Sequence, residues 1–130
     1  ILDATAATNG YSKHNYLREN GIDVKVENWG GKMHMKAAVI DKKHIIVGSM
    51  NWTLAGEKKN DENTILINNS LELAAQLSLF FEKMWKSIPD IYLQKDPLPE
   101  SIESGTSCYD LIDNDFDDII DTNEKECFKI

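Results

Sequence analysis

The sequence has few of the residues that cross-link or stiffen a small protein. It contains 2 cysteines and 3 prolines among 130 residues, so a disulfide-dense scaffold is excluded. No apolar run approaches the roughly 18 residues that a membrane-spanning helix needs. We also find no internal repeat. What remains is a globular domain, and 130 residues suffice for one hydrophobic core.

The start of the sequence lacks both a Met and a leader. No basic segment followed by an apolar stretch opens the chain. The first residues, from Ile1 to Ala4, are typical of the end of a buried strand rather than of a natural N-terminus. We therefore expect further sequence to precede Ile1, and the missing leader says little about targeting.

An excess of positive charge, common in nucleic-acid-binding proteins, is also absent, because the formal net charge is −8. The charge is unevenly distributed. Residues 1–96 hold 12 basic and 12 acidic residues, whereas residues 97–130 hold 2 and 10. The whole excess lies in the tail, so the overall acidity does not exclude a polyanionic substrate for the first part.

Hydrophobic patterning predicts an α/β domain. Alternating or continuous apolar runs predict strands at residues 2–7, 22–26, 36–41, 45–47 and 64–67. Lys42-Lys43 is expected to form a tight turn between the third and the fourth of these strands. Ser12 is expected to cap a short helix through Asn20, with Gly21 just after its end. Ser70 is expected to cap an amphipathic helix through about Lys86. Its predicted core-facing residues are Leu73, Leu77, Phe80, Phe81, Met84 and Trp85.

The strongest pattern begins at His34 and ends at Asn51. It reads H-x-K-x4-D-x6-G-S-x-N without a gap or substitution. His34 and Lys36 are two residues apart at the expected start of a strand, so their side chains should leave the same face. Ser49 and Asn51 have the same spacing at the end of the next strand. The Lys42-Lys43 turn should bring the two pairs side by side.

This pattern resembles the HKD motif of the phospholipase D superfamily. The resemblance covers roughly residues 1–90 and implies a phospholipase-D-like mixed sheet flanked by helices. It also implies that the N-terminal part of the domain, about two strand–helix units, is missing. Residues 1–90 would then form the C-terminal portion of the catalytic domain.

The chemistry that the motif implies is phosphodiester cleavage through a covalent intermediate. Neutral imidazole suits attack on an anionic phosphodiester, which would make His34 the nucleophile and give a phosphohistidine. Lys36, Ser49 and Asn51 would bind the phosphate, with Lys36 and Asn51 stabilising its equatorial oxygens, so catalysis would need no metal cofactor. Asp41 is expected behind the catalytic face in an ordering role.

The stretch after the motif resembles small, single-motif bacterial nucleases. In those proteins a Glu eleven residues after the motif Asn holds the nucleophilic His in its working tautomer, which assigns that role to Glu62. The alternative is an ordinary surface Glu. His14 and His44 lack comparable neighbours in the sequence and are predicted to be surface residues. Gly48 is expected to serve close backbone packing.

One His cannot complete the reaction, because the leaving oxygen needs a general acid. With one motif per chain, the second His34 should come from another subunit of a homodimer. Nucleic acid is the predicted substrate, and lysine pairs near the motif suit a phosphate backbone at Lys42, Lys43, Lys58 and Lys59. The alternatives are a phospholipase D or cardiolipin-type transferase acting on phospholipid, and a non-catalytic calcium-dependent binding module.

The acidic tail forms a separate prediction. Residues 91–107 are expected to be a linker and residues 108–130 a small module, in which Cys108 and Cys127 form a disulfide or remain free thiols. The tail resembles Asp-rich calcium modules. A structural Ca²⁺ would be held by Asp113, Asp115, Asp117, Asp121 and Glu124. The loop departs from the usual calcium loop in having Asp118 where a Gly is normally found. A disordered acidic tail is the alternative. A disulfide would favour an extracytoplasmic location, periplasmic or secreted.

Overall fold

The computed structural model describes residues 1–29, 32–98, 107–109, 111, 119–120 and 125–128. The chain groups into two compact units. The hairpin unit comprises His34–Lys86, and the flanking unit comprises Ile1–Met33 together with Ser87–Ile130. The division into catalytic domain, linker and calcium module concerns function and stays a prediction.

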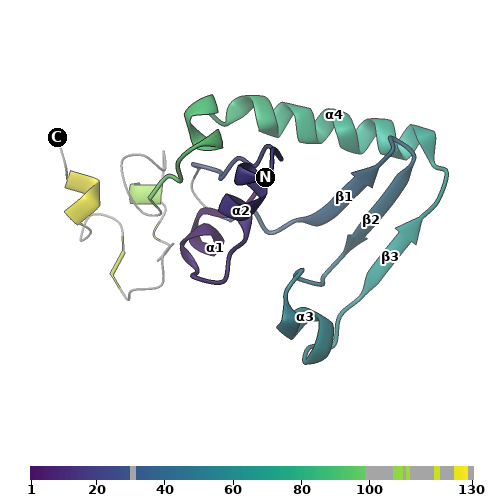
Figure 1. Cartoon of the computed structure of the whole chain (residues 1–130), viewed down its shortest axis with the longest axis horizontal. Coiled ribbons are helices and arrows are strands. Elements are labelled where there is room, and N and C mark those ends of the chain that lie inside the picture. Colours follow the sequence, from purple (N-terminus) through teal and green to yellow (C-terminus); the bar gives the residue numbers. More distant parts are fainter. Residues whose placement is uncertain (30–31, 99–106, 110, 112–118, 121–124, 129–130) are drawn as a thin grey trace. The chain divides into compact units, whose positions relative to one another are not determined.

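The hairpin unit is built on a three-stranded antiparallel sheet of β1 (Lys36–Ile40), β2 (His44–Gly48) and β3 (Thr64–Ile67), in the order β1-β2-β3 (Figure 1). The three strands predicted in this region are therefore confirmed. Within the sheet, Lys36 lies opposite Gly48 and Ile40 opposite His44. This register sets which side chains meet at each end of the hairpin.

The turn between β1 and β2 is as tight as predicted. Asp41 and Lys42 have φ angles of 52° and 55°, and the Lys43 amide donates to the Ile40 carbonyl at 3.1 Å. Two consecutive positive φ angles are the pattern of a type I′ turn, whose twist matches that of the flanking strands. The turn therefore fixes the register without a glycine.

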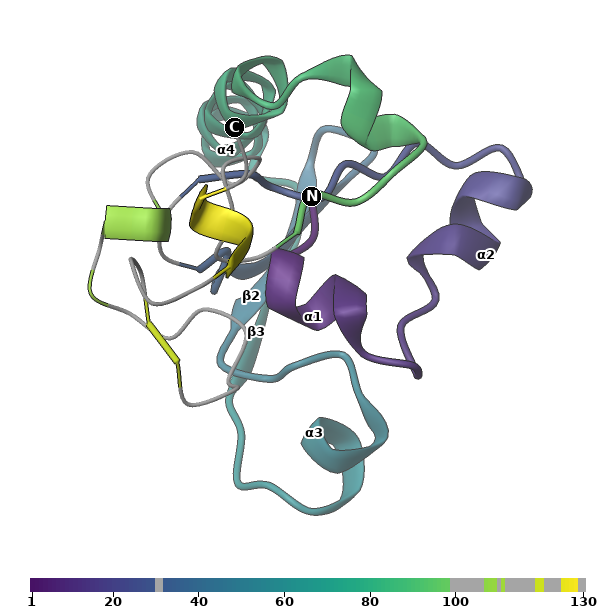
Figure 2. The same cartoon turned by 90° about the vertical axis from the view of Figure 1, so that its left-hand side faces the viewer.

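A short helix, α3 (Leu54–Lys58), lies at the end of the sheet where β2 ends and β3 begins, as both views show (Figures 1 and 2). Thr53 caps it, because its hydroxyl accepts a hydrogen bond from the Gly56 amide at 3.1 Å. This cap satisfies one of the free amides of the first turn.

The long helix α4 (Leu71–Ser87) has the bounds that the sequence predicts. Its buried face is narrower than predicted. Ala74 is fully buried, and Leu77, Met84 and Trp85 are partly buried. The prediction of core positions was wrong for three residues that are between 41% and 49% exposed: Leu73, Phe80 and Phe81. The small Ala74 side chain was overlooked because sequence patterns weight large apolar residues.

The predicted strand at residues 2–7 was wrong, because the flanking unit begins with the helix α1 (Ala4–Thr8). Asp3 caps this helix by accepting from the Ala6 amide at 2.9 Å, and alanine favours the helical conformation. Only Leu2 is paired, in an isolated parallel bridge to Val26. The strand predicted at 22–26 is likewise reduced to this one bridge.

The second helix, α2 (His14–Glu19), ends as predicted but begins differently. Gly21 has a φ of +78°, and its amide donates to the Arg18 carbonyl at 3.0 Å, as expected of a residue that closes a helix. The N-cap is Lys13 rather than Ser12, and its side chain makes no capping bond. Ser12 instead contacts the His14 ring.

Buried polar side chains join the two segments of the flanking unit. The Lys25 ammonium donates to the Ile88 carbonyl at 2.6 Å and pairs with Asp90 at 2.7 Å, at the start of the 3-10 helix η1 (Asp90–Leu93). Glu27 is buried and accepts from the Ala4 amide at 2.9 Å. The two Lys25 contacts hold the chain before the hairpin unit against the chain after it, whereas the Glu27 contact lies within the first segment.

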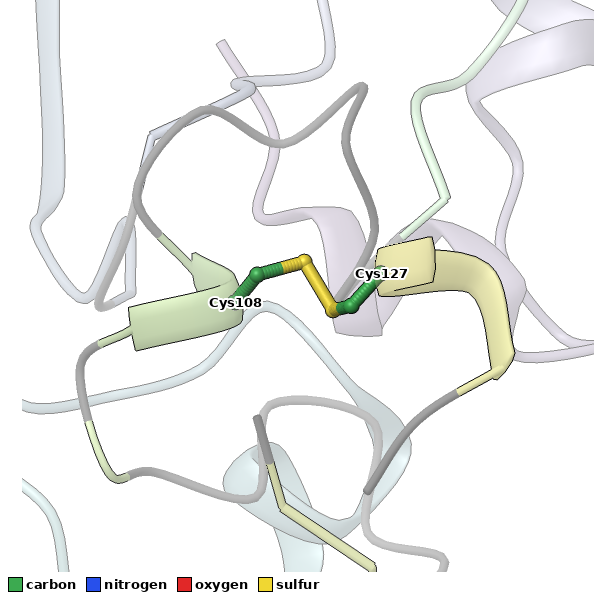
Figure 3. Close-up of a disulfide and its surroundings, with 2 residues drawn as sticks. All are labelled: Cys108 and Cys127. Atoms are coloured by element: carbon green, nitrogen blue, oxygen red, sulfur yellow. A yellow bond between two sulfur atoms is a disulfide. The ribbon is translucent and has the colours of Figure 1, made fainter. Parts of the chain in front are cut away.

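Cys108 and Cys127 form the predicted disulfide, which links the 3-10 helices η3 (Ser107–Tyr109) and η5 (Lys125–Phe128) (Figure 3). Cys108 is 1% exposed. The five acidic residues assigned to calcium lie outside the described residues. No helix in the described parts of the chain is long and apolar enough to cross a bilayer.

Candidate active site

The register of the hairpin brings the two ends of the motif to the same end of the sheet. Lys36 lies opposite Gly48, so the residues before β1 and those after β2 emerge together. His34 lies two residues before β1, and Asn51 three residues past the end of β2. Alternation along β1 therefore fixes the direction of Lys36 alone, and a shared face for His34 and Lys36 stays a prediction.

Ser49 is the most constrained residue of the motif. Its hydroxyl donates to the Glu62 carboxylate at 2.6 Å and accepts from the Asn63 amide at 3.0 Å. Its own amide donates to the Asn63 carbonyl at 2.9 Å. Three hydrogen bonds thus attach the residue after β2 to the segment that enters β3, which gives the site a rigid wall.

Glu62 receives two hydrogen bonds, one on each oxygen. Besides the Ser49 hydroxyl, the side-chain amide of Asn60 donates to Oε1 of Glu62, and its Nδ2 lies 3.1 Å from that oxygen. The Ser49 bond, the Asn60 bond and the positive charge of Lys36 together hold the pKa of Glu62 below its ordinary value. The carboxylate is therefore ionised at neutral pH and close enough to Lys36 for the two charges to interact.

Lys36 connects this wall to His34. Its ammonium donates to the His34 carbonyl at 2.7 Å. The structure thus places Lys36, Ser49 and Glu62 around one point, with the His34 backbone beside them. Of the predicted site residues, these four are brought together by hydrogen bonds or by charge.

Two predicted site residues have free side chains in this arrangement. His34 and Asn51 are exposed, and within the described part of the chain neither the His34 ring nor the Asn51 amide group makes a hydrogen bond. Glu62 is bonded to Ser49 and Asn60 rather than to His34, so its role in orienting the His34 ring stays a prediction.

Two glycines allow the close packing around the motif. A Cβ on Gly48 would lie 2.9 Å from Thr64 Cα and collide with the Asn63 backbone. A Cβ on Gly56 would collide with the Asn51 backbone. Both positions require glycine for space rather than for backbone angle, as predicted for Gly48.

Asp41 lies at the other end of the hairpin, in the turn. Lys42 and Lys43 share that turn, five strand residues or about 16 Å from Lys36. They do not flank the candidate site, which corrects the idea that all four lysines line one phosphate track. Lys58 and Lys59 do lie near it, exposed on the α3 segment that follows Asn51.

An apolar hollow of about 600 Å³ occupies the opposite face of β1. It lies between β1 and α4 and is lined mainly by Met35, Ala37, Val39, Trp52, Leu77 and Phe81. Met35, Ala37 and Val39 alternate with Lys36, so they point to the other face of the sheet. Ala38, which alternates with them and shares the parity of Lys36, also lines the hollow.

Sequence reasoning missed Asn60 and the Asn63 backbone, which hold Glu62 and Ser49. The only local signal was the placement of asparagines on both sides of Asp61-Glu62. No group of three or more His, Cys, Asp or Glu side chains in the described ranges is arranged to hold a metal ion.

Known proteins resemble this chain in sequence and fold. It is 36% identical over 83 residues to a phospholipase D of Rickettsia typhi, covering 64% of this chain and 41% of the relative. It is 40% identical over 80 residues to the mitochondrial cardiolipin hydrolase of mouse, covering 62% of this chain and 35% of the relative. The chain thus spans about two fifths or less of these curated relatives.

Two solved structures share the fold. Nuc from Salmonella typhimurium, a phospholipase D family member, superposes with a TM-score of 0.56 at 29% identity, over 58% of this chain and 50% of that one. NucT from Helicobacter pylori gives 0.57 at 26% identity, over 62% and 56%. The family described as "cardiolipin synthase, PLD-like domain" matches residues 1–85. With the motif, the sheet and this match in agreement, the chain belongs to the phospholipase D-like family of phosphodiesterases.

Proposed function

We propose that this chain supplies half of a nuclease active site that cleaves phosphodiester bonds of nucleic acid through a phosphohistidine. The observation that carries the proposal is the grouping of Lys36, Ser49 and Glu62 at the end of the hairpin, beside His34. This grouping offers the Lys36 cation to a phosphate, beside a wall fixed by Ser49 and Glu62 and next to an unbonded imidazole. It is the arrangement that attack on an anionic phosphodiester requires.

The first step forms a bond between a His34 ring nitrogen and phosphorus while the bond from phosphorus to the leaving oxygen breaks. The leaving oxygen takes a proton from a second imidazole. Water then attacks the phosphohistidine, gives its proton to that second imidazole, and releases the phosphate product. Lys36 and Asn51 would stabilise the oxygens of the phosphorus centre in both steps. The step balances without a metal, so no metal cofactor is proposed for catalysis.

The second imidazole is proposed to come from His34 of another copy. His14 and His44 are poor candidates, because His14 is buried in the flanking unit and His44 lies at the turn end of β2, bonded to Asn68 at 3.0 Å. A homodimer with the two His34 rings facing one phosphate would complete the site. Light scattering should then give twice the chain mass, and an active monomer would refute this part.

A phospholipid substrate is the second candidate function. The names of the curated relatives, phospholipase D and mitochondrial cardiolipin hydrolase, favour it. The position of the apolar hollow argues against it, since three of its lining residues, Met35, Ala37 and Val39, alternate with Lys36. The exposed Lys58 and Lys59 beside the motif suit a polyanionic strand better than a lipid tail.

The test compares both substrates under one condition. Plasmid DNA, single-stranded DNA and vesicles of phosphatidylcholine and cardiolipin are incubated with the chain in EDTA. DNA cleavage is expected to persist in EDTA and to fall at least about 10⁴-fold in His34→Ala. His44→Ala serves as the matched control and should retain activity. Turnover of lipid without cleavage of DNA would overturn the nuclease proposal in favour of the second candidate.

Two further proposals concern the tail. The disulfide supports an extracytoplasmic location, because such bonds persist in oxidising compartments. The spacing of Asp113, Asp115 and Asp117 supports a structural calcium site. Calorimetric titration with Ca²⁺ should show one site per chain in the wild type. The site should be lost in Asp113→Ala, and equal heats in both proteins would exclude it.

A further inference from the structure

Ser12, His14 and Asp96 form a second chemically organised cluster, in the flanking unit and apart from His34. The Ser12 hydroxyl lies 2.7 Å from Nδ1 of His14, and Nε2 of His14 lies 2.7 Å from Oδ2 of Asp96. The His14 side chain is 4% exposed. A hydroxyl, an imidazole and a carboxylate in series is the arrangement that activates a serine nucleophile.

The proton positions follow from the fourth member of the cluster, Arg18. Its guanidinium donates to Oδ1 of Asp96 at 2.8 Å and to the carbonyl oxygens of Val24 and Tyr92 at 3.0 Å and 2.8 Å. Asp96 beside this cation is a carboxylate, which can only accept hydrogen bonds. A neutral His14 must therefore carry its proton on Nε2. Its Nδ1 lone pair is left to accept from Ser12.

Ser12 is the nucleophilic member that solvent reaches, although the Asp96 side chain is also partly exposed at 27%. It is partly exposed between the exposed residues Tyr11 and Lys13, whereas the ring that would serve as its base is buried. An electrophile can reach the hydroxyl from solvent but cannot reach the imidazole. Reaction at this cluster is therefore directed to the Ser12 oxygen.

We propose that Ser12 is a base-activated nucleophile, independent of His34, that accepts acyl groups from activated esters. In the step, the Ser12 oxygen bonds to the acyl carbon and its proton passes to Nδ1 of His14. The bond from the acyl carbon to the leaving alcohol oxygen then breaks, and that oxygen takes the proton from His14. The products are an acyl-serine and the free alcohol, and Asp96 with Arg18 holds the ring in the tautomer that this transfer needs.

The cluster differs from the usual serine hydrolase order in its ring nitrogens, since the serine faces Nδ1 and the carboxylate Nε2. The roles are set by proton positions rather than by nitrogen labels. The competing explanation is structural. The His14 and Arg18 contacts to Asp96 join residues 82 and 78 positions apart, so they also hold α2 against the chain after η1. Only reactivity at Ser12 separates the two explanations.

The experiment uses the full chain and two probes, a fluorophosphonate and p-nitrophenyl acetate. One label per chain is expected, on the peptide that contains Ser12, together with a stoichiometric burst of p-nitrophenol. Ser12→Ala should abolish both, while the control Ser78→Ala should leave both unchanged.

His14→Gln tests the base, and it should slow labelling at least about 100-fold. If this variant does not fold, as judged by its melting curve, the comparison of Ser12→Ala with Ser78→Ala still decides. Labelling spread over several serines, labelling unaffected by Ser12→Ala, or a rate equal to that of the unfolded chain would overturn the proposal.

Discussion

The Ser49 hydroxyl donates to Glu62 at 2.6 Å and accepts from the Asn63 amide at 3.0 Å, so one small side chain links the end of β2 to the start of β3. The link places a carboxylate next to the cation of Lys36 and lowers the pKa of Glu62. The rigidity of the candidate active site depends on this link more than on any other described contact.

Removal of either Ser49 or Glu62 should lower the phosphodiesterase activity because the remaining site residues are no longer held in position, not because a reacting group is lost. Ser49→Ala and Glu62→Gln are each expected to reduce phosphodiester cleavage by about 100-fold. Because the two residues act as a unit, the double variant should lose little more than either single variant. Initial rates of the three variants on one substrate measure this coupling, and fully additive losses would contradict it.

Gly48 should tolerate no side chain. In Gly48→Ala, the new Cβ would meet Thr64 Cα at 2.9 Å and the Asn63 backbone closer still, which would separate β2 from β3. We expect the free energy of unfolding to fall by about 1–3 kcal/mol in urea titrations. Gly10→Ala is the matched control, because nothing lies within 4 Å of its added Cβ. Equal stability of the two variants would show that β3 moves away at little cost.

Stability should depend on pH through Glu27. Burial, the dominant cause, raises the pKa of Glu27 from 4.5 to about 7. Between these values the folded chain holds a proton that the unfolded chain has released. The free energy of unfolding should therefore be highest near pH 4.5 and fall by about 2 kcal/mol as the pH rises to 7, after allowance for screening.

The isosteric variant Glu27→Gln isolates this contribution. Its neutral amide cannot ionise, so the decrease in stability between pH 4.5 and 7 should be smaller by the same amount. Denaturant titrations of both proteins at pH 5, 6, 7 and 8 provide the comparison. Parallel pH curves for the two proteins would remove Glu27 from the explanation.

The disulfide should stabilise the tail by restricting the unfolded chain. Cys108 and Cys127 are 19 residues apart, and closing a loop of this length contributes about 3 kcal/mol. Reduction, or Cys108→Ala with Cys127→Ala, should make the segment between them sensitive to a protease. Mass spectrometry of timed digests locates the cleavage. A tail that resists digestion equally well after reduction would show that other contacts hold it.

The hairpin unit could be predicted from the sequence because its signals are local. The apolar runs flanking Lys42-Lys43 and the long amphipathic run after Ser70 each contain enough information for one element. The segment from Ala4 to Thr8 does not. A short apolar run fits a strand or a helix equally well, and the Asp3 cap that decides for the helix was overlooked.

The candidate active site was predictable in its residues but not in its contacts. The spacing from His34 to Asn51 predicted the family to which the chain belongs, and its predicted chemistry stays a proposal. The bond from Ser49 to Glu62 spans 13 positions and depends on how the intervening loop closes. The prediction that His14 is a surface residue was wrong. His14 contacts Asp96, which lies 82 positions away, so the residues next to His14 in the sequence do not predict its burial.

The type I′ turn at Asp41 and Lys42 has a consequence for how this hairpin can vary. Its residue types are loosely constrained, because Asn or Gly would adopt the same positive φ angles. Its length is not. One inserted residue would shift the pairing of β1 with β2 and turn Lys36 to the face occupied by Met35 and Ala37. The number of residues in a turn about 16 Å from Lys36 therefore decides which face that side chain takes at the opposite end of the hairpin.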